Sequence, residues 1–242
     1  MGSDSSYMIK CVADKGGELR YETSIVEAGI GPLTLRFHCI GNLDQAIDTM
    51  FAELEKRGAG DLLEELCPYF GTLWPSARVL GRWVWEQGPQ AFAGRRVLEL
   101  GCGLALPSFV ASQMGAHVLA TDLHPHVPEF LAENLLANPG IEVGYRRLDW
   151  RDPEALPAAS GYDWILASDV LYEKHQADSL IAFLQTALSV RGQAVILDPD
   201  RTYWNRLVVL GRQAGFRIHT ENLAPLDKND PTHPVLIRIA RR

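Results

Sequence analysis

The chain has 242 residues, of which 47% are hydrophobic, so it can bury the core of one large α/β domain or of one domain with an extension. This hydrophobic share excludes disorder as its main state. Because 23 Lys and Arg residues stand against 30 Asp and Glu, the net charge of -7 disfavours a nucleic-acid backbone as a partner.

The cysteines and the apolar runs are typical of a cytoplasmic protein. None of the four cysteines forms a Cys-x-x-Cys pair, which argues against a zinc knuckle and against a disulfide framework. No apolar run reaches the roughly 18 residues of a membrane span, and the first residues lack the pattern of a signal peptide. These two observations predict no membrane contact. His124 and His126 lack a third placed ligand, so we also expect no metal.

The first part of the chain predicts short strands followed by helices. Residues 7–12, 20–26 and 33–39 favour β-structure and are separated by glycine-rich turns, which indicates a small antiparallel meander. Residues 42–56 repeat apolar side chains at helical spacing, and Asn42 is available as the N-cap. Shorter helical patterns follow at 61–66 and 76–85.

After Gly94 the pattern becomes a regular alternation of apolar strands and amphipathic helices, as in parallel βαβ units. The predicted strands are 96–100, 117–122, 142–147, 164–168, 194–197, 216–221 and 235–240, and the predicted helices are 105–114, 127–136, 176–189 and 203–214. Since no helix separates the last two strands, we expect them to form a hairpin with one antiparallel member. The fold class is therefore α/β, a Rossmann-like seven-strand, mostly parallel sheet with helices on both faces. We expect residues 1–70 to form an extension and residues 71–242 the main domain.

Residues 97–105 run from an apolar strand through Gly101 and Gly103 into a helix. Glycine there lets backbone N–H groups and a ligand approach each other closely, which indicates a nucleotide-like ligand. A dinucleotide fingerprint would need a third glycine three residues after Gly103, but that position holds Leu106, so NAD is disfavoured. The alternative is a tight strand-to-helix turn of any α/β protein.

This segment resembles the first motif of the seven-strand S-adenosylmethionine methyltransferases, an acidic residue followed by Gly-x-Gly-x-Gly, with Ala105 in place of the last glycine. The resemblance implies that Glu99 lies by the methionine end of the cofactor. It also implies that the backbone of the loop, through Gly101, Cys102 and Gly103, skirts the sugar and the amino acid of S-adenosylmethionine.

Two further strand ends fit the same cofactor. Asp122, with Leu123 beside it, ends a strand roughly twenty residues after the glycine loop, where a carboxylate can accept hydrogen bonds from both ribose hydroxyls. Family members place an acid or an amide on the adenine amino group at the position of Asp149, next to an apolar or aromatic neighbour. Trp150 is therefore a candidate to pack on adenine, although a core position is an equal alternative.

Residues 167–172 end the fourth strand without the two prolines of adenine and glutamine N-methyltransferases. Asp169 to Tyr172 instead resembles the Asp/Glu-x-x-Tyr/Phe motif of the protein-lysine methyltransferase branch, and Trp74 with Pro75 resembles an element found before the sheet of that branch. The resemblance covers residues 71–206 and implies that Trp74 and Ser168 lie near the cofactor. The alternative is that Asp169 caps a helix and Tyr172 lies in the core.

Methyl transfer requires an aligned, neutral nucleophile and the exclusion of water. We assign Asp169 first to positioning the incoming lysine ammonium and second to accepting a proton, and we assign Tyr172 to lining the wall of the channel. Residues 198–204 either line the substrate entrance or form an ordinary helix start, with Thr202 as cap and Arg201 paired with an acid.

These features predict a methyltransferase that uses S-adenosylmethionine, releases S-adenosylhomocysteine and acts on a lysine of a partner protein. A small-molecule N- or O-methyltransferase and a catalytically silent cofactor-binding or interaction module are the alternatives. We expect the extension before residue 71 to lie over the active site and to select the substrate. Neither the substrate nor the oligomeric state follows from the sequence.

Overall fold

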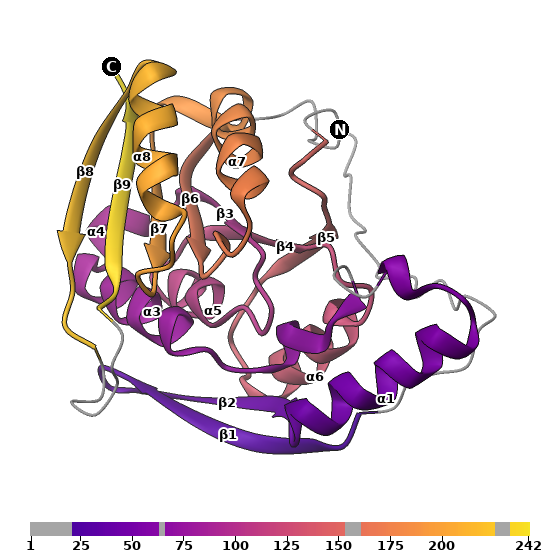
Figure 1. Ribbon diagram of the computed structural model, residues 1–242. Helices are drawn as coiled ribbons and strands as arrows, with labels where there is room; N and C mark the ends of the chain where they lie inside the picture. Colours follow the sequence, from indigo (N-terminus) through magenta and orange to yellow (C-terminus); the bar gives the residue numbers. More distant parts are fainter. Residues whose placement is uncertain (1–20, 63–65, 153–160, 226–232) are drawn as a thin grey trace, which may run out of the picture.

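A seven-strand sheet forms the centre of the computed structural model, which describes residues 21–62, 66–152, 161–225 and 233–242 (Figure 1). The strand order is β5-β4-β3-β6-β7-β9-β8, and every neighbouring pair is parallel except the two that involve β9. The strands are β3 (Arg96–Leu100), β4 (His117–Asp122), β5 (Gly144–Arg147), β6 (Tyr162–Ser168), β7 (Leu188–Asp198), β8 (Phe216–Asn222) and β9 (Val235–Arg241). The predicted fold class is confirmed, and β9 is the expected antiparallel member of the final hairpin.

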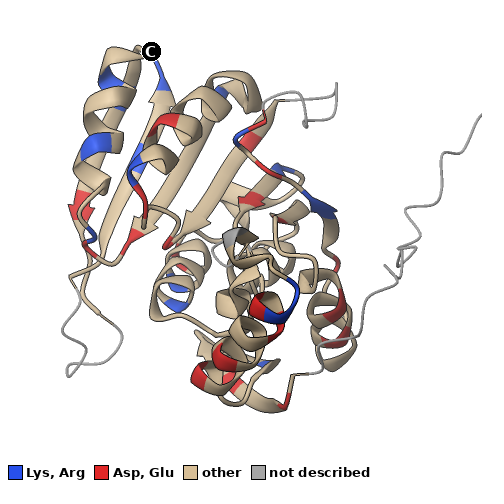
Figure 2. Cartoon of the chain, turned by 45° about the vertical axis from the view of Figure 1, so that its right-hand side comes forward, with Lys and Arg blue, Asp and Glu red and all other residues tan. Residues whose placement is uncertain are grey.

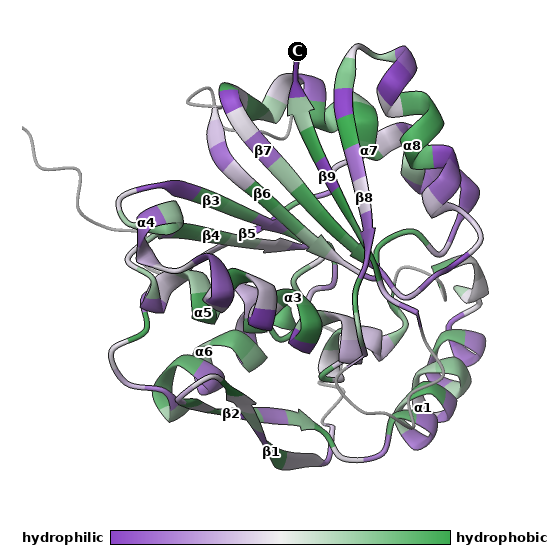
Figure 3. Ribbon diagram, turned by 90° about the vertical axis from the view of Figure 1, so that its left-hand side faces the viewer, coloured by the Kyte–Doolittle hydropathy of each residue, from purple (hydrophilic) through white to green (hydrophobic). Residues whose placement is uncertain are grey.

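Helices cover both faces of this sheet (Figure 3). One face carries α3 (Pro75–Gln87), α4 (Pro89–Phe92), α5 (Leu106–Gln113) and α6 (Val127–Ala137), and the other carries α7 (Lys174–Ala187) and α8 (Trp204–Gln213). In the part of the chain that the structure describes, none of the helices is both long and apolar enough to cross a membrane.

The central strands are apolar on both faces because both faces are covered. In β3, Val97 packs into the core under α3 and α5, whereas its neighbour Leu98 packs into the core under α7 and α8. Figure 2 shows that charged residues gather on helices and loops and are sparse in the middle of the sheet. Burial on both sides is the reason that these strands read as continuous apolar runs.

The largest difference from the predicted strands is at β7, which starts at Leu188 instead of residue 194. The predicted helix 176–189 ends earlier, at Ala187, and the chain passes directly from α7 into the strand. The added residues include Ser189, Arg191 and Gln193, so this stretch lacks the apolar signal on which the prediction relied. Backbone pairing of Leu188 with Tyr162 of β6 holds it in the sheet all the same.

Two strands at the start of the described chain form an antiparallel hairpin, β1 (Thr23–Ile30) and β2 (Leu33–Ile40). The predicted strand at 7–12 lies outside the described residues. The predicted strand at 20–26 was wrong at both ends, since β1 begins at Thr23 and continues through Gly29 to Ile30. The turn is made at Gly31, whose φ of 56° suits glycine.

The helix predicted at 42–56 is confirmed as α1 (Leu43–Lys56), and the side chain of Asn42 accepts a hydrogen bond from the backbone of Gln45 as its N-cap. The predicted helix at 61–66 is reduced to one 3-10 turn, η1 (Gly60–Leu62), and residues 63–65 are outside the described part. A second 3-10 turn, η2 (Pro68–Gly71), leads into α3.

Asn134 of α6 and Asn138, the C-cap of that helix, join the hairpin to α6. The amide of Asn138 accepts from the backbone N–H of Arg36 at 2.9 Å and donates to the carbonyl of the same residue at 2.7 Å, as a neighbouring strand would. One turn earlier, Asn134 accepts from the N–H of His38 at 2.6 Å. These amides satisfy backbone groups on the edge of β2 that faces away from β1, where no further strand of the described residues is paired.

We expect Asn138→Ala to lower the free energy of unfolding by about 2–3 kcal/mol, because it leaves the N–H and the carbonyl of Arg36 without partners. Urea denaturation followed by circular dichroism measures the change. Gln113→Ala is the matched control, since its amide makes only one hydrogen bond of 3.4 Å at the surface. It should cost less than about 0.5 kcal/mol, and equal losses in the two variants would contradict the bridging role of Asn138.

Candidate functional site

A cavity of about 540 Å³ lies at the carboxyl ends of the central strands. It opens beside β3 and β6, the point where the strand order reverses and where open α/β sheets bind ligands. Every site residue predicted from the sequence lines it except Glu99. From the part of the chain before residue 71, η2 contributes to the described lining, whereas β1 and β2 do not.

The glycine loop after β3 forms the floor of the cavity. Gly101 and Gly103 have φ values of 59° and 50°, in the left-handed region, and a Cβ at Gly103 would lie only 3.0 Å from the carbonyl oxygen of Phe70. Ala105 has a φ of 60° without being glycine, at a strain of roughly 1–2 kcal/mol. The left-handed backbone at Ala105 explains why a third glycine suits this position.

Asp122 ties the glycine loop to the loop after β4. Its Oδ2 accepts from the N–H of Gly103 and its Oδ1 accepts from the N–H of His124, both at 2.9 Å. Burial raises the pKa of this carboxyl, while the backbone hydrogen bonds act in the opposite direction. Each oxygen keeps a lone pair with which it can accept a further hydrogen bond from a ligand in the cavity.

Glu99 lies beneath the loop. Its Oε2 accepts from the backbone N–H of Ser108, at 2.9 Å, and from the hydroxyl of the same residue, in the first turn of α5. With 1% of the residue exposed, burial raises its pKa to about 8 against the lowering effect of these hydrogen bonds. Glu99 therefore supports the loop from below, and its contact with the cofactor stays a prediction.

His124 is a residue whose importance the sequence did not reveal. Its ring stacks on Phe70 with centroids 4.1 Å apart, Nδ1 accepts from the N–H of His126 at 3.2 Å, and Nε2 lies 3.1 Å from the carbonyl oxygen of Leu66. Burial lowers the pKa of His124 to about 4, so the ring is neutral and donates from Nε2. It fastens η2 over the cavity, a contact that loop spacing alone does not signal.

Asp149 and Trp150 line the side of the cavity next to β5. Arg151 donates from Nε to both oxygens of Asp149, each at 2.9 Å, and this pairing lowers the pKa of Asp149 although partial burial acts to raise it. The indole Nε1 of Trp150 is buried without a hydrogen-bond partner, and a Cβ added at Gly101 would lie 3.4 Å from the ring. Trp150 therefore forms a wall of the cavity as well as contacting the core beneath it.

Asp169 and Tyr172 lie at the mouth. The alternative that Asp169 caps a helix is excluded, because α7 begins with a capping box made by Glu173 and Gln176. Tyr172 is 54% exposed, so it is not a core residue either. The carboxylate of Asp169 is held by the guanidinium of Arg201, which donates from Nε and Nη2.

Residues 198–204, the region after β7, fit parts of both predicted interpretations, a lining of the substrate entrance and an ordinary helix start. Arg201 pairs with an acid and also lines the cavity, whereas Thr202 is not the cap, because α8 begins after Tyr203. The indole of Trp74, which also lines the cavity, donates to the carbonyl of Tyr69 at 2.9 Å. Tyr69 lines the cavity as well, and no motif in the sequence pointed to it.

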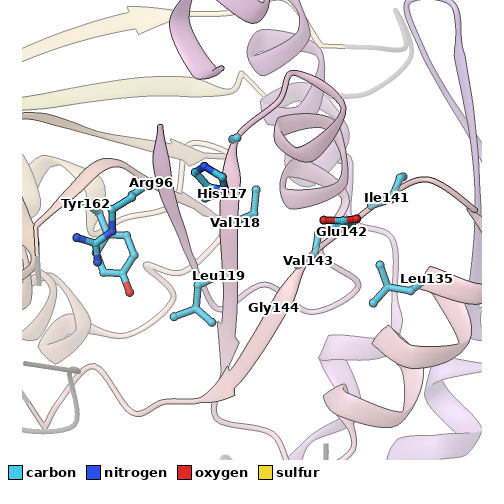
Figure 4. Close-up of a pocket in the computed structure, with 11 residues that line it drawn as sticks. Arg96, His117, Val118, Leu119, Leu135, Ile141, Glu142, Val143, Gly144 and Tyr162 are labelled. Carbon is cyan, nitrogen blue, oxygen red and sulfur yellow. The ribbon is translucent and has the colours of Figure 1, made fainter. Parts of the chain in front are cut away.

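A second cavity, of about 580 Å³, lies at the opposite edge of the sheet, where β3 to β6 begin (Figure 4). It is lined mostly by aliphatic side chains, and Arg96 lies over the ring of Tyr162, 4.9 Å from its centroid. Ligands of open α/β sheets bind at the carboxyl edge instead, so we assign the functional site to the smaller cavity. Among the described residues, no group of three or more His, Cys, Asp or Glu side chains is placed to hold a metal.

Residues 67–203 match the family model described as lysine methyltransferase, which covers more than half of the chain. The electron transfer flavoprotein beta subunit lysine methyltransferase of Xenopus laevis is 29% identical over 168 residues, 68% of this chain and 63% of the relative. The histone-arginine methyltransferase METTL23 of Homo sapiens is 32% identical over 117 residues, 46% of this chain and 59% of the relative. The chain spans about half to two thirds of the length of the first curated relatives that it matches.

Solved structures show the same fold. The 16S rRNA N2 G1207 methyltransferase RsmC of T. Thermophilus, in complex with AdoMet and guanosine, matches with a TM-score of 0.64 and 17% identity. The match covers 93% of this chain and 52% of that chain. The fold is therefore the one found in S-adenosylmethionine-dependent methyltransferases.

We expect Glu99→Gln to flatten the dependence of stability on pH. The pKa of Glu99 is about 8 in the folded state and near 4.5 in the unfolded state, so its contribution is present below pH 4.5 and is lost as the pH rises to about 8. The free energy of unfolding of the variant, relative to that of the wild type, should rise by roughly 3–5 kcal/mol between pH 4.5 and pH 8.5. Urea unfolding at several pH values measures this gain, and parallel curves for the two proteins would contradict a buried, neutral Glu99.

Proposed function

This chain belongs to the lysine methyltransferase family, and we propose that it transfers a methyl group from S-adenosylmethionine to a lysine side chain of a partner protein. The observation that carries the proposal is a single cavity lined by the glycine loop, Asp122, Asp169 and Tyr172. The cofactor residues and the acceptor residues thereby open to one space, as direct transfer between two bound molecules requires.

The described residues fit the cofactor. Asp122 has free lone pairs for the ribose hydroxyls, Gly101 and Gly103 leave room for a ligand on the backbone, and Trp150 offers an apolar wall for adenine. Asp149, held by Arg151, is our candidate for the adenine amino group. When bound, the cofactor supplies an electrophilic methyl group on a positively charged sulfonium, which suits a cavity built over acidic groups.

The acceptor side has two tasks, to align the amine and to exclude water. Tyr172 and Tyr69 stand at the mouth, each about half exposed, where their rings can contact the aliphatic part of an incoming lysine. Asp169 is oriented by its contacts to Arg201 and can accept a hydrogen bond from the amine. The net charge of -7 also favours a cationic acceptor.

A partner protein is our preferred acceptor because the mouth is open and flanked by exposed aromatic rings. The relative named as a histone-arginine methyltransferase makes an arginine acceptor the second candidate. The cytoplasmic location expected from the sequence stays a prediction, and the free thiols of Cys39, Cys67 and Cys102 are compatible with it.

Transfer of labelled methyl groups from S-adenosylmethionine into a cell lysate tests the function. We expect label in a protein band, stable to base and recovered as methyl-lysine after hydrolysis. With Asp169→Asn the rate should fall about 100-fold, because the amide keeps only one acceptor oxygen and can no longer hold the guanidinium of Arg201 through two oxygens, while asparagine tolerates the φ of 58° at this position. Label confined to the ultrafiltrate would overturn the protein acceptor, and label in methyl-arginine would favour the second candidate.

Binding of S-adenosylhomocysteine tests the role of Asp122 independently of turnover. We expect Asp122→Ala to weaken binding by at least about 100-fold in calorimetry, because the ribose hydroxyls lose a charged acceptor. Asp122→Asn, which keeps one acceptor oxygen, should be intermediate. Asp178→Asn at the surface is the control, and a melting curve checks that each variant is folded. Unchanged affinity in the folded Asp122→Ala protein would remove Asp122 from the ribose site.

A further inference from the structure

The ion pair at the mouth of the cavity joins residues 32 positions apart. Nε and Nη2 of Arg201 face Oδ1 and Oδ2 of Asp169, the second contact at 3.0 Å, in the side-by-side geometry that arginine forms with carboxylates. The side chain of Asp169 is 11% exposed and that of Arg201 is 42% exposed. Both residues line the cavity, so the pair faces any acceptor that enters.

The chain around Arg201 is built to direct it toward Asp169. The backbone N–H of Arg201 donates to Oδ1 of the fully buried Asp198, and Asp200, with a φ of 73°, accepts from the indole of Trp204 at 2.9 Å. Asp169 also has a positive φ, and its N–H donates to the carbonyl of Leu197 at 2.9 Å. Unfavourable backbone conformations at Asp169 and at Asp200, the residue before Arg201, are typical of functional sites.

A carboxylate without a partner would hinder the reaction that we propose. A negative charge within about 4–6 Å of an amine raises the pKa of the amine by about 1–3 units, so it would hold lysine as an ammonium. An ammonium has no lone pair and cannot attack the methyl group. The guanidinium of Arg201 compensates the charge of Asp169 but leaves lone pairs on its oxygens for a hydrogen bond.

We propose that Arg201 is a positioning residue that keeps Asp169 charge-compensated while the acceptor is bound, so that the cavity favours a neutral amine over an ammonium. This inference rests on the proposed function. In the transfer step the lone pair of the neutral amine forms the N–C bond while the C–S bond breaks and its electron pair remains on sulfur. The positive charge passes from the sulfonium to the methylated amine, which later releases its proton to water.

The other titratable groups that face the pair of Asp169 and Arg201 determine the pH range in which the inference can be tested. Tyr69 faces Arg201 from η2, Tyr172 from the loop after β6, and Asp198 from the end of β7. With Arg201 in place, burial raises the pKa of Asp198 to about 6, partial burial raises the pKa of Tyr172, and a hydrogen bond with Cys67 raises the pKa of Tyr69. In the wild type, therefore, none of the three titrates strongly between pH 7 and 9.5.

The remaining charges nearby are unchanged by a substitution at position 201. Arg151 and Asp149 form an ion pair, and Nδ1 of His175 lies 3.0 Å from a carboxylate oxygen of Glu173; all four residues line the same cavity. Glu99, whose pKa is about 8, titrates beneath the floor in the wild type and in the variants alike. A difference between two pH profiles therefore reports on Arg201.

The test compares pH profiles of methyl transfer for the wild type and Arg201→Gln. A dilution series of the lysate, assayed with saturating S-adenosylmethionine, yields relative values of kcat and KM for the labelled acceptor at each pH. We expect the rising limb of the plot of kcat against pH to shift to higher pH by about one unit in Arg201→Gln. At pH 7 this shift lowers kcat about tenfold, and the difference from the wild type becomes smaller toward pH 9.5. Arg201→Lys, which keeps the charge, should lie between the two.

Arg206→Gln is the matched control. Arg206 holds Asp178 through the same two atoms, at 2.8 and 2.7 Å, on the surface of α8 and away from the cavity, so its profile should equal that of the wild type. A loss in Arg201→Gln of the same size at every pH would indicate a purely structural role and would overturn the proposal.

A binding measurement separates this inference from the proposed function. We expect n-butylammonium at pH 7.5, titrated by ligand-observed NMR into protein saturated with S-adenosylhomocysteine, to bind Arg201→Gln at least threefold more tightly than the wild type. Neutral n-butanol should bind both equally. Equal affinities for n-butylammonium would contradict the role of Arg201 even where the lysate is labelled. An absence of label with the expected difference in binding would instead count against the function alone.

Discussion

The carboxylate of Asp122 is the interaction on which the rest of the site depends. It receives the backbone N–H groups of Gly103 and His124, and so fixes two loops that follow neighbouring parallel strands. His124, held in this way, stacks on Phe70 and donates to Leu66, which places η2 over the cavity. The single carboxylate of Asp122 thus positions the glycine loop at the floor of the cavity, the loop after β4 and, through His124, η2 above the cavity.

Burial of acidic groups around this site gives it its electrostatic character. Glu99 lies in the core near Asp122, and Asp198 lies in the core near Asp169. Burial raises the pKa of Glu99 and that of Asp198. Desolvated acids are costly unless they are hydrogen-bonded or near positive charge. Here Ser108 and Arg201 supply part of that compensation, and a sulfonium cofactor would supply more when it is bound.

The hairpin before the main sheet is joined to the methyltransferase fold through amide side chains instead of strand pairing. Asn134 and Asn138, one helical turn apart, serve as partners for the backbone of β2. Because α6 also contacts η2, the helix that holds the hairpin also contacts the cover of the cavity.

The sequence by itself determined the layout of strands and helices, because each apolar pattern records which face of its own segment is buried. It also placed Gly101, Asp122, Asp149 and Asp169 at strand ends, and parallel strands bring such ends to one edge of the sheet. Only the tertiary structure decided that Arg201 pairs with Asp169, 32 residues away, that His124 reaches Leu66 across 58 residues, and that Asn138 bonds Arg36 across 102. These partners come from separate loops and helices, and their meeting depends on how whole elements pack, which no local pattern records.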